Sequence, residues 1–583
     1  MHELYEIFEQ KVILRISHRV CDTADELLAS DLFREVVTLA VRKLEQRRSI
    51  LLDVFGKKNI SEEDIAILIE TLQFLSKMPG EMVPKVVSGA DVLLKNPFLL
   101  NDLVEFLYNF WRSYDRYVLC DSSEDDMDKR PYRTFNNTIE HLTHLIRKTY
   151  RDIEENITGS HPRTYRQLRA GAEIAAISMP MDIPLPGGSY RKLKQIPVIR
   201  QVLLYPPLIL DPPMNKRTGR FEKVAVNPLD IVTPDPADWL CYPAKVGPLV
   251  ILVYFHKKFF ELGFSLCNLF DMADDNDLQK PPDAVYLFGT PEADPSGTGC
   301  FPTVFFDDRE NSILSAAAPN ADQFGYFGYL KKMVLTLHNI RMMKRGSLPF
   351  HGAMVRIIMK GDRARNILII GDTGAGKSET LEAFRELGEE MIQDMIVISD
   401  DMGSLEIHDG HVIGYGTEIG AFLRLDDLAP GYALGQIDRA IIMNPNKINA
   451  RIILPVTTME HVLKGYEVDI VLYANNYEEI DEEHTVIERF QDMRHALDVF
   501  RQGMVMSKGT TTSKGIVHSY FANIFGPPQY KDLHEPLALR YFETLFASDA
   551  FVGQMRTRLG IPGWERSGPE EAARALLGMM NTP

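Results

Sequence analysis

The stretch ARNILIIGDTGAGKSETLEAF, residues 364–384, decides the fold of the C-terminal half of the chain. The apolar residues 367–370 predict a buried strand, a glycine-rich loop follows, and a helix is expected to begin near Ser378. Gly371, Gly376, Lys377 and Ser378 satisfy the pattern G-x-x-x-x-G-K-[ST] in the strand-to-helix context that a phosphate-binding loop requires. The sequence therefore predicts that this loop holds the phosphates of a nucleotide.

Each residue type in this loop has a physical task. Glycines let successive backbone N–H groups converge on an anion, and the N-terminus of the following helix adds partial positive charge. We expect Lys377 to reach the terminal phosphates and the Ser378 hydroxyl to bind Mg²⁺. The predicted nucleotide-binding residues of the loop are Gly371, Asp372, Thr373, Gly374, Ala375, Gly376, Lys377, Ser378 and Glu379.

Length, charge and cysteine usage limit the class of protein. A chain of 583 residues is too long for one compact core, so roughly two to four domains are expected. With 64 Lys and Arg against 81 Asp and Glu, the net charge of −17 argues against a nucleic-acid partner. The longest apolar run, residues 246–255, is too short to span a bilayer, and the first residues do not resemble a signal peptide, so no membrane partner is expected. The 5 cysteines lack C-x-x-C spacing, which is typical of reduced thiols and predicts a cytoplasmic protein.

Changes in composition and in the spacing of apolar residues predict four regions along the chain. Residues 1–155 carry apolar side chains at helical intervals, with an S-x-x-D capping pattern at the start of 61–78; they predict an all-α domain of unknown role that offers a surface to a protein partner. Residues 156–198, rich in Gly, Pro and basic residues, predict a linker or irregular segment. Short strand-like runs predict a mixed α/β substrate-side domain at 199–345. Alternating strands and helices predict an α/β nucleotide-binding domain at 346–583.

A pair of carboxylates ends the next buried strand after the loop. Asp400 and Asp401 close the segment DMIVISDD, residues 394–401. Hard cations take oxygen ligands, and the phosphates of a nucleotide can complete the coordination shell. The pair therefore predicts a site for Mg²⁺ or Mn²⁺ carried with the nucleotide.

At these residues the chain resembles the phosphoenolpyruvate carboxykinases, in particular the ATP-using branch, over roughly residues 220–558. That family has a tyrosine five residues before the first of two lysines and a histidine twenty residues after that lysine; Tyr326, Lys331 and His351 keep both intervals. The resemblance implies a carboxykinase-like mixed α/β core. It also implies that Lys331 and His351 are ligands of a catalytic Mn²⁺ and that Tyr326 contacts the substrate. Because a lysine ligates a metal only as the neutral amine, the pKa of Lys331 is expected to be lowered.

The resemblance extends to further motifs. The family's aspartate pair matches Asp400 and Asp401, which implies that Asp401 binds Mn²⁺ directly and that Asp400 holds the Mg²⁺ of the nucleotide through water. EIGAFLR resembles the family's E-G-G-x-x-x-K, with Arg424 in place of the lysine. NARIILP resembles N-T-R-x-x-Y-P and implies that Arg451 contacts the transferring phosphate. SKGIVHSYFANIFG resembles the nucleotide-base segment, with Lys514 where an arginine is usual.

Other features depart from that family. The loop GDTGAGKSET is closer to the one in HPr kinase/phosphorylase than to the G-x-S-G-T-G-K-T-T of the carboxykinases, and HGAMV resembles the H-G-V-x-V of the same kinase. The G-R-S-P-K-D-K element that binds the dicarboxylate in carboxykinases is not recognisable. TGRFEKVAV is the nearest candidate and implies a substrate contact by Arg220.

Three functions stay open at this point. The first is an ATP-, Mn²⁺- and Mg²⁺-dependent carboxykinase that converts oxaloacetate, a small anionic substrate, to phosphoenolpyruvate; its catalytic residues would be Lys331, Lys377, Arg424, Arg451 and Asp401. The second is an HPr-kinase-like phosphotransferase acting on a protein or small-molecule hydroxyl, in which the acidic pair helps to deprotonate the acceptor. The third is a nucleotide-binding regulatory protein without turnover.

Overall fold

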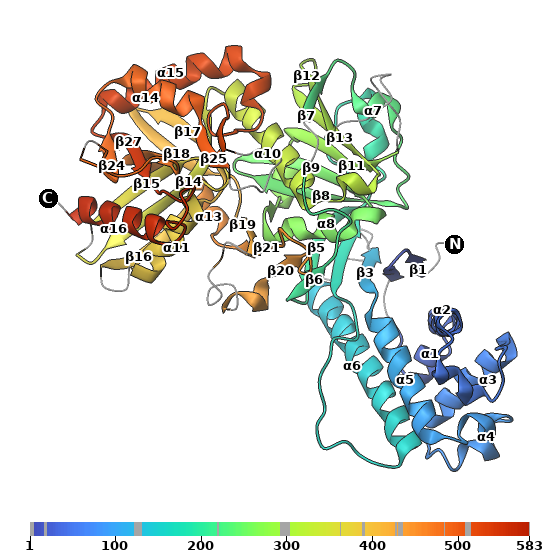
Figure 1. Cartoon of the computed structure of the whole chain (residues 1–583). Helices are drawn as coiled ribbons and strands as arrows, with labels where there is room; N and C mark the ends of the chain where they lie inside the picture. Colours follow the sequence, from blue (N-terminus) through green and yellow to red (C-terminus); the bar gives the residue numbers. More distant parts are fainter. Residues whose placement is uncertain are drawn as a thin grey trace. The chain divides into compact units, whose positions relative to one another are not determined.

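The fold is given by a computed structural model that describes residues 5–16, 20–121, 131–217, 221–291, 303–361, 363–387, 391–425, 428, 435–482, 484–507 and 515–581. The chain forms two compact units (Figure 1). The N-terminal unit comprises Met1–Pro180 and Ile199–Tyr205, and the C-terminal unit comprises Met181–Val198 and Pro206–Pro583. Each unit is described by itself. Both combine helices with β-sheet, so the protein is mixed α/β.

The N-terminal unit pairs a helical bundle with a sheet. Its strands are β1 (Tyr5–Phe8), β2 (Lys11–Ile16), β3 (Asp115–Asp121), β4 (Ile174–Met179) and β5 (Val198–Leu204), and they neighbour one another in that order. β1 and β2 form an antiparallel hairpin, whereas β2, β3 and β4 run parallel. One apolar core joins the main helices α1 (Ala24–Leu28), α2 (Asp31–Arg47), α3 (Glu62–Leu75), α5 (Pro97–Arg112) and α6 (Pro131–Thr158).

The prediction of an all-α N-terminal domain is wrong, because the chain begins with strands and returns to the sheet at β3. The reason lies in β2, KVILRI, which is paired on both edges, by β1 and by β3. Its three consecutive apolar residues, 12–14, break the period-two alternation of a half-buried strand, and such a short run cannot be told from a helical segment by periodicity. The helix predicted at 61–78 is confirmed as α3, with a capping box between Ser61 and Asp64.

The C-terminal unit contains two large sheets and a long buried helix. One sheet has the order β8 (Trp239–Val246), β9 (Leu249–His256), β11 (Ala284–Thr290), β13 (Ile313–Pro319), β12 (Thr303–Asp308) and β7 (Phe221–Val224). The other has the order β22 (Tyr466–Glu467), β18 (His411–Gly416), β17 (Met402–His408), β14 (Leu348–Met359), β15 (Ala364–Ile370), β23 (Ile470–Asn475), β27 (Phe551–Arg556) and β24 (Ile487–Arg489), with β16 (Ile392–Ser399) paired to β14. Helix α10 (Phe327–Lys344) contacts strands of both sheets and is buried along nearly its whole length, although it carries polar side chains such as Lys331, His338 and Asn339.

Strand pairing brings distant segments to the end of β15. β14 runs antiparallel to β15, with Gly352 opposite Ile370, so the start of β14 lies where the glycine-rich loop begins. The N–H of Gly371 donates to the carbonyl of His351 at 3.2 Å. The turn between β16 and β17 reaches the same place, since the N–H of Gly352 donates to the carbonyl of Asp401 at 2.9 Å. Backbone hydrogen bonds therefore fix the loop, the histidine and the aspartate together.

A smaller sheet completes this region. Its order is β19 (Gly420–Arg424), β21 (Arg451–Pro455), β20 (Ile441–Met443) and β6 (Leu208–Leu210). Among the described residues of either unit, no helix combines the length and the apolar character needed to cross a membrane.

Candidate functional site

A cavity of about 120 Å³ opens beside the glycine-rich loop of the C-terminal unit. Most of the residues that the sequence singled out line this one cavity. They are Tyr326, Lys331, His351, Thr373, Gly374, Lys377, Ser378, Glu379, Asp400, Asp401, Arg424 and Arg451. The cavity thus brings together residues from separate segments of the chain: the glycine-rich loop, the acidic pair, the lysine, the histidine and the two arginines.

The loop has the strand and helix that its motif requires. β15 precedes it, and α11 (Lys377–Leu387) begins at the lysine. Gly374 and Gly376 have φ of +81° and +97°, a left-handed conformation that glycine adopts without steric cost. A Cβ at Gly376 would lie 2.7 Å from the Cβ of Thr557, so this position also lacks room for a side chain. The Lys377 ammonium lies back over the loop and donates to the carbonyls of Gly371 at 2.6 Å and Asp372 at 3.2 Å.

Two polar side chains that the sequence interpretation missed hold the loop backbone. The Asn476 amide donates to the carbonyl of Gly374 at 2.9 Å, and the Thr557 hydroxyl donates to the carbonyl of Ala375 at 2.7 Å. They directly follow β23 and β27, which run parallel to β15 and to each other. Polar residues after parallel strands meet at one edge of a sheet, so the signal was present in the sequence.

A chain of three polar side chains, Lys331, Asp401 and His351, crosses the cavity. The Lys331 ammonium lies 2.7 Å from one carboxylate oxygen of Asp401, and Nε2 of His351 lies 2.9 Å from the other. Lys331 also lies 3.8 Å from Glu418. Lys331, His351 and Glu418 are almost fully buried, so these contacts have little solvent screening.

The contact between Nε2 of His351 and Asp401 requires a proton or a metal cation between the two atoms. Nδ1 of His351 faces the carbonyl of Ala522, and because a carbonyl only accepts, Nδ1 carries the hydrogen. In a neutral imidazole, Nε2 would then direct a lone pair at a carboxylate oxygen of Asp401. This contact is favourable only when a proton or a metal cation lies between the two atoms.

Three buried carboxyl groups, those of Asp400, Asp401 and Glu418, lie near the single ammonium of Lys331, and their pKa values differ widely. Burial alone would raise the pKa of Asp401, but Lys331 and His351 outweigh burial and hold it well below its usual range. Burial raises the pKa of Asp400 to about 6, and the neighbouring charge of Asp401 adds to the effect. Burial likewise raises the pKa of Glu418 to about 8. Asp401 is therefore the ionised partner of Lys331, while Glu418 keeps its proton at neutral pH.

The lowered pKa expected for Lys331 occurs at its neighbour instead. Burial opposes the charge of Lys331, but Asp401 and Glu418 together raise its pKa above the ordinary lysine value. Lys332 also lines the cavity, and burial together with the charge of Arg217 lowers its pKa to about 8. Lys332 is thus closer to the neutral amine that a metal requires.

Two arginines face each other at the same cavity. Arg424 on β19 and Arg451 on β21 are directly opposite in the antiparallel register. Like charges at opposite positions repel, so a negative charge between the two guanidinium groups would stabilise the pair. The Arg451 guanidinium packs on the Phe422 ring at 5.2 Å, and its buried Nε makes no hydrogen bond within the described residues. The pair is suited to bind an anion such as a phosphate.

Of the three remaining predicted site residues, the structure describes Tyr326 but not Arg220 or Lys514. Tyr326 is the N-cap residue of α10, and its ring lies 6.0 Å from that of Phe422. Arg220 and Lys514 lie outside the described residues. Arg217, three residues before Arg220 in the sequence, is described, and its charge helps burial to lower the pKa of Lys332.

The donor set at Asp401 is mixed in character. Within the described ranges, no group of three or more His, Cys, Asp and Glu side chains is arranged to hold a metal ion. His351 and Asp401 therefore provide two donors, and a third would come from the lysine pair of α10.

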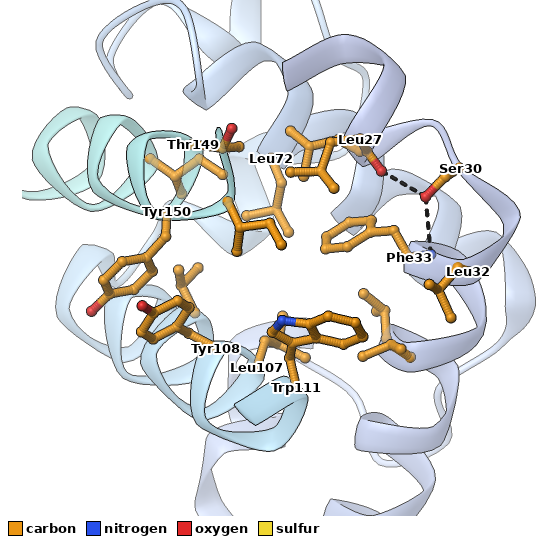
Figure 2. A pocket seen from close by; sticks show the side chains of 16 residues that line it. Leu27, Ser30, Leu32, Phe33, Leu72, Leu107, Tyr108, Trp111, Thr149 and Tyr150 are labelled. Atoms are coloured by element: carbon orange, nitrogen blue, oxygen red, sulfur yellow. Dashed lines mark hydrogen bonds between the residues drawn. The ribbon is translucent and has the colours of Figure 1, made fainter. Parts of the chain in front are cut away.

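A second cavity, in the N-terminal unit, differs in chemistry. It also has a volume of about 120 Å³ and lies among α1, α2, α3, α5 and α6 (Figure 2). The polar ends of its aromatic walls are bonded elsewhere: the Trp111 indole N–H donates to the carbonyl of Ala170 at 2.6 Å, and the Tyr150 hydroxyl donates to Glu105. Tyr108 and Tyr150 stack face to face at 4.1 Å. Its lining is apolar and contains no carboxylate, lysine or arginine, so it has no groups for phosphoryl transfer.

No protein-family model matches the chain, and no curated protein matches it.

Proposed function

We propose that the chain is a carboxykinase-like enzyme that converts oxaloacetate and ATP to phosphoenolpyruvate, CO₂ and ADP with the help of Mn²⁺ and Mg²⁺. One observation carries the proposal: the phosphate-type loop, the Lys331–Asp401–His351 chain and the arginine pair line a single cavity. In this proposal the loop would bind the nucleotide, the Lys331–Asp401–His351 chain would hold a cation, and the arginine pair would bind an anion.

The glycine-rich loop would bind ATP, the phosphoryl donor. Lys377 would exchange the carbonyls of Gly371 and Asp372 for the terminal phosphate oxygens of ATP. Arg424 and Arg451 would take up the negative charge that spreads over the transferring phosphoryl group. Charge neutralisation by groups already in place is the main contribution that a protein makes to this kind of transfer.

The cation side follows from the donor set at Asp401. His351 and Asp401, with Lys331 or Lys332 as an amine, would hold Mn²⁺, while Ser378 and Asp400 would hold the Mg²⁺ of the nucleotide. When bound, a divalent cation stabilises negative charge on substrate oxygens. The His351 tautomer fits this role, because the Ala522 carbonyl keeps the hydrogen on Nδ1 and leaves the lone pair on Nε2.

The reaction needs no nucleophile from the protein. The bond between C3 of oxaloacetate and its departing carboxylate breaks, and the electron pair remains on the substrate as an enolate while CO₂ leaves. The enolate oxygen then attacks the γ-phosphorus of ATP, and the bond to ADP breaks. Tyr326 would contact the substrate carboxylate, so that the reacting atoms are held in line.

The test is a product assay on the purified chain with oxaloacetate, ATP, Mg²⁺ and Mn²⁺. Phosphoenolpyruvate should form, and Arg451→Lys should lower kcat by about tenfold or more, because a lysine loses the planar two-point contact with phosphate. Asp409→Gly, in the exposed turn between β17 and β18, is the control. Absence of phosphoenolpyruvate under these conditions would reject the carboxykinase reaction.

A second function is favoured by Asp400. Burial raises its pKa to about 6, near the value that suits a general base, and it lines the cavity with the loop. In this alternative, Asp400 takes the proton of a protein or small-molecule hydroxyl, whose oxygen then attacks the γ-phosphorus of ATP. Release of ADP only after addition of a hydroxyl acceptor such as L-serine or glycerol, without phosphoenolpyruvate, would support it.

The proposal also covers location and partners. Cys241 and Cys267 are free thiols, which supports a reducing cytoplasmic environment. The ligands would be a nucleotide and a small anion at the cavity, and a protein partner would use the N-terminal unit.

A further inference from the structure

A strained turn lies next to the candidate site. Phe521, Ala522 and Asn523 are three successive non-glycine residues with φ of +44°, +57° and +61°. Residues with a side chain rarely enter this left-handed region, and runs of them are rarer still. Such strain persists where the surrounding structure holds the backbone in place, and it concentrates at functional sites.

Contacts on several elements hold this turn. The Asn339 amide of α10 donates to the carbonyl of Phe525 at 2.9 Å. The Tyr520 hydroxyl donates to Glu535 of α15 (Lys531–Ala547) at 2.9 Å. Gly503, the C-cap of α14 (Met493–Gln502), packs so closely that a Cβ there would lie 1.8 Å from the carbonyl oxygen of Ser519. The turn is therefore in contact with α10, α14 and α15.

The same turn contacts both halves of the candidate site. On the cation side, the carbonyl of Ala522 accepts the hydrogen of Nδ1 of His351. On the loop side, the Asn523 amide donates to one carboxylate oxygen of Asp372 at 3.3 Å. The Ser519 hydroxyl lies 3.3 Å from the other oxygen of Asp372 and 3.2 Å from the carbonyl of Gly503, so its single hydrogen is divided between the two.

We propose that residues 519–523 form a positioning element that couples nucleotide binding at the loop to metal binding at His351. The identity of the two ligands rests on the proposed function. When a nucleotide orders the loop, Asp372 and the turn are ordered with it, and the imidazole is then already fixed when the metal arrives. By linkage, the metal raises the affinity for the nucleotide by the same factor.

The test measures this coupling rather than activity. The affinity of the full chain for Mn²⁺ is obtained from the electron paramagnetic resonance signal of free Mn²⁺, without and with a β,γ-methylene analogue of ATP. The analogue also binds Mn²⁺ in solution, but that contribution is the same for every variant and cancels in the comparison. The coupling factor of each variant is the ratio of the two affinities.

Asn523→Gly is the main variant, because glycine keeps the left-handed φ and removes only the amide. The coupling factor should fall by roughly fivefold, the value of one hydrogen bond, while Mn²⁺ binding without nucleotide changes by less than about twofold. Ser519→Thr retains the hydroxyl and should retain the coupling. Asp409→Gly removes another polar residue with positive φ, at +52°, and is the matched control that should have no effect.

A second variant keeps the test decisive if Asn523→Gly folds poorly. Ala522→Gly retains the carbonyl but frees the backbone, so Mn²⁺ should bind roughly fivefold more weakly even without nucleotide. Equal coupling in wild type and Asn523→Gly, with Ala522→Gly unchanged, would overturn the proposal even if phosphoenolpyruvate is formed. Loss of coupling in the variant of a protein that forms no phosphoenolpyruvate would uphold this element and reject the carboxykinase reaction. A wild type that binds neither ligand would reject both.

Discussion

Replacing Lys331 with methionine tests the charge arrangement of the cavity. Methionine keeps the unbranched apolar stem and removes the ammonium. The Lys331 side chain is 2 % exposed and lies 2.7 Å from Asp401 and 3.8 Å from Glu418. The substitution therefore leaves the Asp401 carboxylate without its closest positive partner.

The size of the effect follows from this burial. Removing one partner of a buried ion pair costs about 3–5 kcal/mol of unfolding free energy, because the other charge is left uncompensated. The Asp401 side chain remains 22 % exposed, so water reaches it and we expect the lower end, about 3 kcal/mol.

The effect should depend on pH in a definite direction. Against the effect of burial, Lys331 and His351 hold the pKa of Asp401 below its usual range, and without Lys331 that pKa rises. Below the raised pKa the carboxyl takes a proton and the penalty falls; above it the full penalty applies. The loss of stability should thus be about 3 kcal/mol at pH 8 and clearly smaller at pH 5.

The assay is urea unfolding of the full chain at pH 5 and pH 8 in the presence of a chelator, followed by the fluorescence of Trp239 and Trp564 in a Trp111→Phe background. Lys245→Met is the matched control, because Lys245 pairs with Asp277 at 2.5 Å but is 22 % exposed; it should cost about 1 kcal/mol or less. An equal loss for Lys331→Met at both pH values, or a loss below about 1 kcal/mol at pH 8, would refute the charge arrangement.

Three further outcomes are expected. Burial raises the pKa of Glu418 to about 8, so the stability that this raised pKa contributes is fully present below about pH 4.5 and is lost as pH rises to 8. Glu418→Gln should remove about 2–4 kcal/mol of that fall, and an equal pH dependence of stability in wild type and variant from pH 5 to 9 would contradict it. Thr557→Val should weaken nucleotide binding about fivefold in calorimetry, whereas Thr544→Val, which removes an exposed hydrogen bond on α15, should not. Lys377→Ala should weaken nucleotide binding about 10- to 100-fold with an unchanged circular dichroism spectrum; a change within threefold would contradict its role.

The parts of the site that are local in sequence were predictable. The loop follows from a short pattern whose glycines, lysine and flanking apolar strand lie within 21 residues, and the structure has β15 and α11 around it. The acidic pair was found because two carboxylates follow a buried strand. Only the resemblance connected His351 to them, since the antiparallel pairing of β14 with β15 cannot be derived from spacing.

Other features depend on the tertiary environment and could not be found from the sequence. The neighbours Lys331 and Lys332 have the same chemistry, but Asp401 faces one and the charge of Arg217 acts on the other, so their pKa values move in opposite directions. Glu418 keeps its proton because it is 1 % exposed, which no local pattern reports. The strands of the N-terminal unit were missed because β2 is paired on both edges and lacks alternation.

If Mn²⁺ binds at Asp401 as proposed, these protonation states predict that its binding releases a proton. Asp401 cannot neutralise an ammonium and a divalent cation at once, so a cation at Asp401 weakens its bond to Lys331. Lys331 then either loses its proton and becomes a neutral ligand, or turns to Glu418, which must ionise to receive it. In both cases about one proton leaves the site per cation at pH 7. Calorimetry of Mn²⁺ binding in buffers of different ionisation enthalpy measures this number directly, and Glu418→Gln separates the two routes, because only the first survives in the variant. Binding without proton release would show that Asp401 is not a ligand.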